Sequence, residues 1–193
     1  MQPIADVPEM ELTNIDGQIT ATINSLAGRY AGLDFAAIFV AKYMIFVLVL
    51  SVAASWYVRI DRATWRFRAI SCGLAVAAGL LLNQVILLFV SRVRPYDLGL
   101  THLIVEKSAD PSFPSDHATV VFAVAFTLIL LRDRFRHIYL ILAVMVALAR
   151  IFIGVHFFGD VVGAILTAAV AAVLVNVIYK SGSKLNRLLV RIF

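Results

Sequence analysis

Cysteine is nearly absent from this chain of 193 residues, and the single one, Cys72, lies inside an apolar run. One cysteine excludes an intramolecular disulfide and a cysteine-rich metal site, so we interpret Cys72 as a small buried apolar residue. Charge is also scarce, because Asp, Glu, Lys and Arg make up 15% of the chain, against about 25% in ordinary soluble domains. With 62% hydrophobic residues, the sequence predicts an integral membrane protein built as a single domain over residues 1–193.

Acidic residues are the scarcer charged class, which leaves a formal net charge of +5. An excess of positive charge can indicate nucleic-acid binding. Here, however, the basic residues lie in short connections between apolar runs, where membrane topology accounts for them. We therefore expect membrane lipids but no nucleic acid as partners, and no feature of the sequence indicates an obligate protein partner.

Five apolar stretches are long enough, or nearly so, to cross a bilayer, whose core of about 30 Å needs about 20 helical residues. Their ranges are 33–58, 69–90, 117–131, 138–155 and 161–179. The expected fold is therefore an all-α integral membrane protein, with a bundle of five transmembrane helices over 33–179.

Two shorter segments flank this bundle. Within 1–32, apolar residues recur at helical spacing among polar ones, at Ile15, Ile19, Ile23 and Leu26. This pattern predicts an amphipathic helix that lies in the membrane interface, because the segment is too short and too polar to span. The segment 180–193 forms a basic tail.

Positive charge concentrates in alternate connections of the predicted bundle. The basic residues there are Arg59, Arg62, Arg66 and Arg68 after the first span, Arg132, Arg134 and Arg136 after the third, and Lys180, Lys184, Arg187 and Arg191 in the tail. The positive-inside rule places these regions and the C-terminus in the cytoplasm. The N-terminus, the loop 91–114 and the turn 155–160 are then expected to face outward.

Three segments with ionisable residues fall on this outer side, at 92–95, 114–117 and 150–160. Ionisable side chains at the edges of apolar segments indicate a functional site. His156 and Asp160 are four apart, so on a helix they would share one face. A carboxylate bonded to one imidazole nitrogen leaves the other free to attack or to accept a proton. A helix-terminal hydrogen bond without catalysis would use the same spacing.

His117 supplies a second imidazole on the same side, after a segment that is typical of a helix start. Ser115 or Asp116 is expected to be the N-cap of the following helix. Free backbone N–H groups at a helix N-terminus can also bind an anion. Capping and anion binding are compatible, so both interpretations stay open.

Arginines on this side are candidate ligands for phosphate, because guanidinium groups bind its oxygens through paired hydrogen bonds. Arg92 and Arg94 could instead anchor the chain at the membrane surface. Arg150 lies between two apolar runs, and an arginine there normally faces the interior or a polar cavity. His102, on the outer loop, is not expected to contact substrate.

A metal site is the chief rival use of His117, His156 and Asp160, since two histidines and a carboxylate can ligate zinc. The nearby arginines argue against it, because they repel a cation and can themselves neutralise a phosphate. We therefore expect neither a metal nor another cofactor.

Together, the three segments resemble the signature motifs of the type 2 phosphatidic acid phosphatase superfamily of membrane lipid phosphatases. Those motifs are Lys, six residues, Arg-Pro; then Pro-Ser-Gly-His; then Ser-Arg, five residues, His, three residues, Asp. Here they correspond to Arg94-Pro95, to Pro114-Ser115-Asp116-His117, and to Ala149-Arg150 with His156 and Asp160. The order and spacing of the motifs agree, and the resemblance covers about 33–179.

Three positions depart from the pattern. Leu87 stands where the motif has its lysine, Asp116 stands for the glycine and Ala149 for the serine. Arg92 is a candidate substitute for the lysine. The motif Phe-Pro-Ser-Asp-His at 113–117 and the small size of the chain resemble the bacitracin-resistance branch of bacterial undecaprenyl-diphosphate phosphatases.

That resemblance implies a metal-independent enzyme of the bacterial cytoplasmic membrane. It would hydrolyse undecaprenyl diphosphate on the outer face, which recycles the lipid carrier of peptidoglycan biosynthesis. His156, oriented by Asp160, would form a phosphohistidine, and His117 would protonate the leaving group. Arg94, Arg150, Ser115 and the backbone around Asp116 would hold the phosphate.

Other functions remain open at this point. The substrate could instead be phosphatidylglycerophosphate, phosphatidic acid or lipid A, or the enzyme could transfer phosphate to another lipid. A different class of function is a membrane protein that binds or transports an anion without turnover.

Overall fold

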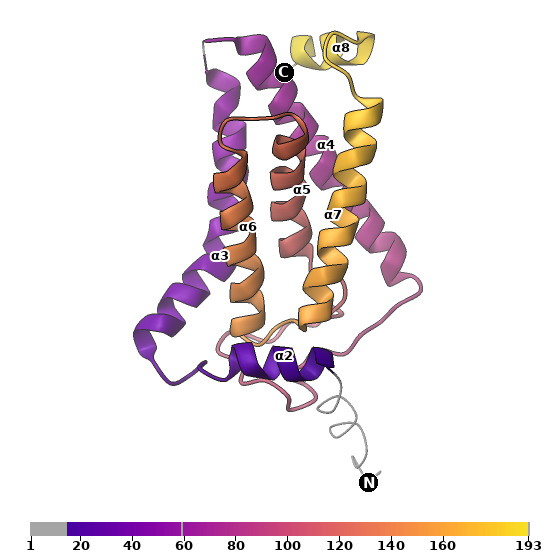
Figure 1. Cartoon of the computed structure of the whole chain (residues 1–193). Coiled ribbons are helices and arrows are strands. Elements are labelled where there is room, and N and C mark those ends of the chain that lie inside the picture. Colours follow the sequence, from indigo (N-terminus) through magenta and orange to yellow (C-terminus); the bar gives the residue numbers. More distant parts are fainter. Residues whose placement is uncertain (1–14, 59, 193) are drawn as a thin grey trace.

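The computed structural model describes residues 15–58 and 60–192, and within them every regular element is helical (Figure 1). The elements in chain order are α2 (Ile15–Asn24), α3 (Ala31–Ala54), the short 3₁₀ helix η1 (Ser55–Tyr57), α4 (Arg62–Leu87), α5 (Asp116–Leu130), α6 (Arg136–Phe152), α7 (Phe158–Ile178) and α8 (Lys184–Ile192). The predicted all-α class is confirmed. The boundaries 1–32, 33–179 and 180–193 fall close to the starts of α3 and α8.

Helix α5 forms the centre of the bundle, where it packs against α4, α6 and α7. From Ala118 to Leu128 every side chain of α5 except Phe126 is buried. Many of the residues that meet it are alanines, such as Ala143 of α6 and Ala164 of α7, each fully buried. Small side chains let helix backbones approach closely, which is how helices associate where water supplies no hydrophobic drive.

Within residues 15–58 and 60–192, three helical segments are long and apolar enough to cross a membrane: α3 with η1, α4 and α7. Helix α5 is a shorter apolar helix of 15 residues, and α6 has 17 residues and ends at Phe152 rather than at Val155 as predicted. Helix α3 leaves large apolar side chains such as Phe35, Phe46 and Leu50 exposed. Such a surface is suited to lipid tails, and the chain is a membrane protein.

Helix α4 begins earlier than the sequence predicted, at Arg62 instead of Ala69. Arg66 and Arg68 therefore lie on its first turns and not in the connection. A helix satisfies its own backbone hydrogen bonds beyond the apolar core, and long basic side chains reach outward along it. Here Arg66 lies 4.5 Å from the ring centre of Trp56.

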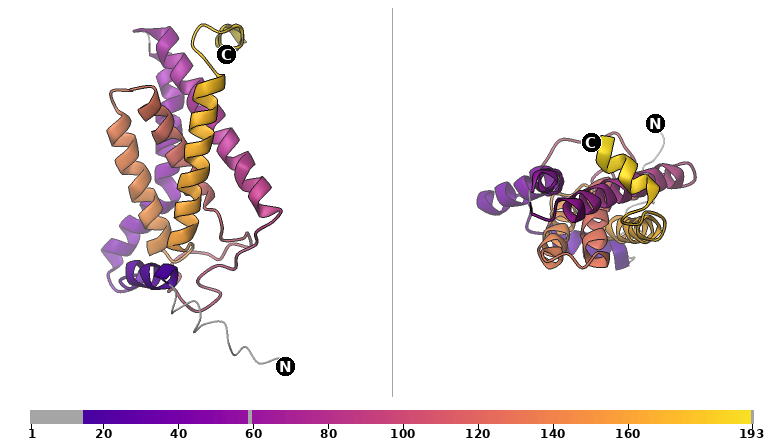
Figure 2. Two further views of the ribbon diagram at one scale, coloured as in Figure 1. Left: turned by 45° about the vertical axis from the view of Figure 1, so that its right-hand side comes forward. Right: turned by 90° about the horizontal axis from the view of Figure 1, so that it is seen from above.

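The two ends of the bundle differ in what covers them. One end carries the α3–α4 connection, the α5–α6 connection and α8 (Figure 1). At the other end, the last turns of α4 diverge from α7, and the chain returns beneath the bundle through residues 88–115 (Figure 2). The α6–α7 turn is at this second end, and α2 lies across it.

The predicted helix near the N-terminus is present as α2, but its inner face is not the apolar one. Its buried residues are Gly17, Thr20 and Asn24, whereas Ile15 is 76% and Leu26 43% exposed. The inner residues are small or hydrogen-bonding, and they face the polar ends of α6 and α7. The contact therefore combines hydrogen-bonding residues with one apolar residue, Ile23, which packs against the core of the bundle, while Ile15 and Leu26 point outward.

Candidate active site

A cavity of about 320 Å³ opens at the end of the bundle that α2 covers. Residues of all three predicted motif segments line it: Arg94, Asp116, His117, Arg150 and His156. Gln84 and Leu87, from the diverging end of α4, complete one wall. A larger groove of about 700 Å³, between η1 and α4, is lined by aliphatic and aromatic side chains alone. The groups that can do chemistry therefore converge on the smaller cavity.

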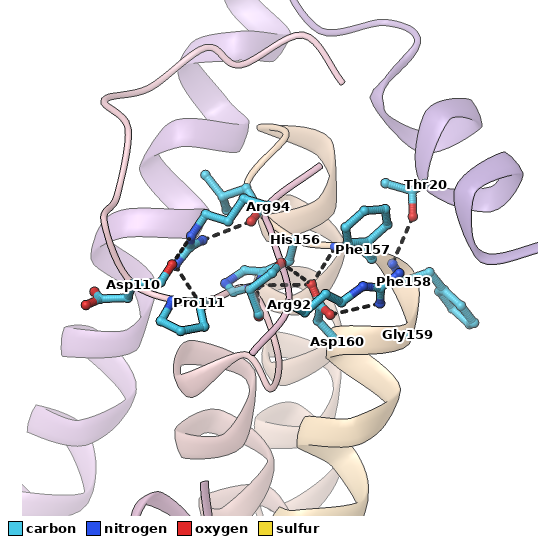
Figure 3. A network of polar contacts seen from close by, with 12 residues as sticks. Thr20, Arg92, Arg94, Asp110, Pro111, His156, Phe157, Phe158, Gly159 and Asp160 are labelled. Carbon is cyan, nitrogen blue, oxygen red and sulfur yellow. Dashed lines mark hydrogen bonds and ion pairs between the residues drawn. The ribbon is translucent and has the colours of Figure 1, made fainter. Parts of the chain in front are cut away.

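His156 lies buried in the turn between α6 and α7 (Figure 3). Its Nδ1 is 2.8 Å from the carbonyl oxygen of Ser112 and 3.5 Å from Oδ2 of Asp160. Because a carbonyl only accepts hydrogen bonds, Nδ1 carries the proton and Nε2 of the neutral ring keeps its lone pair. Burial lowers the pKa of His156; the charges of Arg150 and Arg94 lower it further, while Asp160 raises it. An unprotonated Nε2 is therefore expected at neutral pH.

The pairing of His156 with Asp160 differs from the expected geometry. The spacing predicted one shared helix face, but α7 begins after His156, and only Asp160 lies in its first turn. There Oδ2 accepts hydrogen bonds from the N–H of Phe157, at 2.8 Å, and from Ser112 Oγ. Arg92 Nη1 donates to Oδ1 over 3.1 Å. Donors thus hold both oxygens of this fully buried carboxylate beside the imidazole.

Arg94 is buried, with 6% of its surface exposed. Its guanidinium donates to three backbone carbonyls: Asp110 at 2.8 Å, Val155 at 2.9 Å and Pro111 at 3.4 Å (Figure 3). A guanidinium has five N–H donors, so these contacts do not exhaust it. Arg94 therefore ties the 88–115 loop to the α6–α7 turn and keeps donors for the cavity that it lines.

Among the described residues at this end, the acceptor Asn83 Oδ1 and two buried donor groups, Arg150 Nε and Ser115 Oγ, lack a hydrogen-bond partner. Arg150 stands in the last turn of α6 and lines the cavity. Ser115 is fully buried directly before α5 and makes no side-chain capping bond. Burying a polar group without a partner costs about 1–3 kcal/mol. Such donor groups at the edge of a polar cavity are suited to an anionic ligand that completes their bonds.

The N-terminal turn of α5 faces the same cavity, through Asp116 and His117. Ser115, as N-cap, leaves the first N–H groups of α5 without a side-chain acceptor, and such groups attract anions. The carboxylate of Asp116 accepts a hydrogen bond of 2.7 Å from Asn83, a fully buried residue of α4. Asn83 also donates to Thr119 over 2.9 Å, so α4 fixes the start of α5.

Arg92 does not occupy the place of the missing lysine. Leu87 itself lines the cavity, whereas the guanidinium of Arg92 lies 3.6 Å from the ring centre of Phe157 and pairs with Asp160 and Asp16. This arrangement directs it at carboxylates behind His156. We therefore assign Arg92 to the support of the site rather than to the cavity.

Sequence reasoning missed several residues that shape the site. Ser112 contacts both His156 and Asp160, yet nothing in its local sequence distinguishes it from an ordinary loop serine. Asn83 had a usable signal, because it is a polar residue inside an apolar stretch. His102 lies against the α2–α3 turn: a side chain at Gly28 would meet its ring at 2.7 Å.

Comparisons with known proteins identify the family of this chain. The family model of the PAP2 superfamily matches residues 68–183. Undecaprenyl-diphosphatase BcrC of Bacillus subtilis is 27% identical over 157 residues, 81% of this chain and 80% of that protein. The bacitracin transport permease protein BcrC of Bacillus licheniformis is 29% identical over 154 residues, 79% of this chain and 75% of that protein.

A solved structure has the same fold. It is the PAP2-type phosphatidylglycerolphosphate phosphatase of Bacillus subtilis, with a TM-score of 0.62, 21% sequence identity and 92% of each chain covered. The family match includes the three segments whose side chains line the cavity, and it confirms the resemblance that these motifs indicated. The chain belongs to the PAP2 superfamily of membrane phosphatases.

Proposed function

We propose that this protein hydrolyses undecaprenyl diphosphate to undecaprenyl phosphate and inorganic phosphate at the outer face of the bacterial cytoplasmic membrane. One observation carries the proposal: two arginines and two histidines surround a single cavity at the end of an apolar bundle. The partnerless Ser115 Oγ and Arg150 Nε support an anionic ligand there. Relatives whose names include undecaprenyl-diphosphatase support the choice of substrate.

In the first step, Nε2 of His156 attacks the terminal phosphorus in line with the bond to the bridging oxygen. That P–O bond breaks as the N–P bond forms, and undecaprenyl phosphate leaves. Asp160 and the carbonyl of Ser112 hold the ring for attack and stabilise the positive charge that it gains. His117 donates a proton to the departing oxygen.

In the second step, water attacks the phosphorus of the phosphohistidine and releases inorganic phosphate. His117, now neutral, takes the proton of this water, which restores both histidines. Arg94, Arg150, Ser115 and the first N–H groups of α5, at Asp116, stabilise the phosphoryl oxygens in both steps. The scheme requires neither a metal nor another cofactor.

The proposed topology has five membrane crossings within one domain, formed by α3, α4, α5, α6 and α7. At 1.5 Å per residue, the 15 residues of α5 and the 17 of α6 span about 22 and 25 Å, which is shorter than the bilayer core of about 30 Å, so the adjoining turns would complete these two crossings. The end with α8 and its arginines would be cytoplasmic, and the cavity would face outward.

The substrate test measures phosphate release by purified protein in excess EDTA, from undecaprenyl diphosphate, phosphatidylglycerophosphate and phosphatidic acid in parallel. We expect a strong preference for the prenyl diphosphate that EDTA does not reduce. A preference for a glycerolipid would reassign the substrate and keep the histidine mechanism. A base-stable, acid-labile phosphoprotein that is absent from His156→Asn would support the intermediate.

A labelling experiment tests the orientation. Cys72 is the only cysteine, so Cys72→Ala gives a background for single cysteines at Asp97, in the 88–115 loop, and at Arg134, between α5 and α6. In intact cells, a membrane-impermeant maleimide should label the first and spare the second until the membrane is permeabilised. The reverse pattern would overturn the proposed orientation.

A further inference from the structure

Helix α2 supplies hydrogen-bond acceptors to the first turn of α7, which carries Asp160. Asp16 Oδ1 accepts a hydrogen bond of 2.6 Å from the N–H of Gly159. Thr20 Oγ1 accepts one of 3.0 Å from the N–H of Phe158, as Figure 3 shows. The first N–H groups of a helix have no partner within it, and a carboxylate there is favoured by the helix dipole. A separate helix thus completes the N-terminus of α7.

The same carboxylate also fixes the arginine that holds Asp160. Arg92 donates from Nη2 to Asp16 Oδ2 over 2.7 Å and from Nη1 to Asp160 Oδ1 over 3.1 Å. Its planar guanidinium stacks on Phe157, 3.6 Å from the ring centre. With one nitrogen on each carboxylate and a ring beneath, the guanidinium has a fixed position. Asp16 therefore influences the position of the Asp160 carboxylate by two routes: through Arg92 and through the backbone of the first turn of α7.

Helix α2 contacts α7 closely, and hydrogen bonds at both ends of α2 fix its position against the bundle. A Cβ at Gly159 would lie 2.9 Å from Asp16 Oδ2 and 3.3 Å from Arg92 Nη1, so glycine permits the approach. At the other end of α2, Asn24 exchanges hydrogen bonds with the N–H and carbonyl of His102, at 2.7 and 3.0 Å. Asn24 also donates to the carbonyl of Phe152, the last residue of α6, over 2.6 Å.

We propose that α2 belongs to the catalytic apparatus and that Asp16 is a positioning residue, which acts through Arg92 and the first turn of α7 on Asp160. This inference rests on the proposed roles of His156 and Asp160. It goes beyond the family motifs, because Asp16 lies outside the matched range 68–183. A helix whose composition is typical of the membrane surface thereby sets the geometry of the nucleophile.

The test is steady-state kinetics of Asp16→Asn, which keeps the shape of the side chain and removes its charge. We expect kcat to fall at least tenfold while KM stays within twofold, because small displacements of a reacting group lower the rate of the chemical step. Thr20→Val, which removes one acceptor, should lower kcat about threefold. Thr22→Val is the matched control: Thr22 is exposed on α2 and its hydroxyl bonds within the helix, to the carbonyl of Gln18.

The outcomes separate this inference from the proposed function. Absence of turnover by the wild type, or full activity of His156→Asn, overturns the proposed function and the inference together. If the wild type is active and His156→Asn is not, a kcat for Asp16→Asn within twofold of wild type overturns the inference alone. If Asp16→Asn does not fold, Thr20→Val decides the test, and an unchanged kcat of Thr20→Val overturns the inference alone. A fall in kcat with unchanged KM and unchanged thermal midpoint supports the positioning role.

Discussion

Both ends of the bundle are rich in arginine, but the arginines at the two ends differ in burial and in the groups that they contact. At the cavity end, Arg94 is 6% exposed, and its donors are directed at carbonyls and at the cavity. At the opposite end, Arg134 is exposed and lies over aromatic rings, 4.4 Å from the ring centre of Phe135. Arg68 there pairs with the buried Asp133 at 2.9 Å.

This difference shows that the positive-inside rule accounts for the placement of only some of the arginines. An arginine that is desolvated and bonded to carbonyls or carboxylates differs from one whose head group stays in the aqueous interface. Arg68 also pairs with a buried carboxylate, so the presence of an adjoining polar cavity, lined by Arg94 and Arg150, and not the number of arginines, distinguishes the candidate phosphate site from the other end. Substitutions at the two ends should therefore have effects of different kinds and sizes.

The largest effect is expected at the two histidines. His156→Asn and His117→Asn should each lower phosphate release at least about 1,000-fold, because one removes the nucleophile and the other the proton donor. Thermal midpoints in detergent should stay close to that of wild type. Activity within a few-fold of wild type in either variant would contradict the assigned roles.

A matched pair of arginine variants should give the next largest effect. Arg150→Lys should lower kcat/KM about 100-fold, since lysine cannot reproduce the planar, paired donors of a guanidinium. Arg134→Lys, at the opposite end, should change kcat/KM less than twofold. Equal effects of the two substitutions would show that the two ends do not differ as described.

The pH dependence should report the environment of His156. The neutral ring attacks, so kcat/KM should fall as the pH drops through the pKa of His156, which burial, together with Arg150 and Arg94, holds below its ordinary value. Arg150→Gln removes one lowering charge and should move this acidic limb to higher pH, whereas Arg150→Lys should leave it in place. A shift to lower pH in Arg150→Gln would contradict the assignment.

At the opposite end, the expected effect is on stability alone. Arg68→Gln leaves the buried Asp133 without its partner and should lower the free energy of unfolding by about 2 kcal/mol. Arg134→Gln loses exposed cation–π contacts with Phe135 and Trp65, and about 0.5 kcal/mol is expected. Thermal unfolding in detergent measures both, and the specific activity of the folded protein should be unchanged. A large loss of specific activity in Arg68→Gln would extend the site to this end.

Much of the fold follows from composition and periodicity. Long apolar runs predict helices in a bilayer, because only a helix satisfies its own backbone there. The exact starts were harder to predict: α4 continues to Arg62 because basic side chains do not end a helix, and they reach the interface from its first turns. The length of α6 was overestimated, since the apolar run after Phe152 forms part of the turn that carries His156.

The candidate site was predictable to the extent that it depends on motif spacing. Arg94, His117, Arg150 and His156 line one cavity, as the expected alternation of the spans indicated. The spacing of His156 and Asp160 was informative, although the shared helix face was wrong. Ser112 and Asp16 could not be predicted, because their contacts join residues 44 or more positions apart in the chain.

The membrane class, the helical fold and the gathering of ionisable groups at one end follow from the amino-acid sequence, because hydrocarbon admits few charges and few backbone conformations. Tertiary structure decided which of those groups meet. It turned Arg92 toward Asp160, directed the Nδ1–H of His156 at the carbonyl of Ser112, and placed the hydrogen-bonding face of α2 against α7. These outcomes depend on how the turns and helix ends pack in three dimensions, and hydrogen bonds between distant segments leave no periodic trace in a sequence.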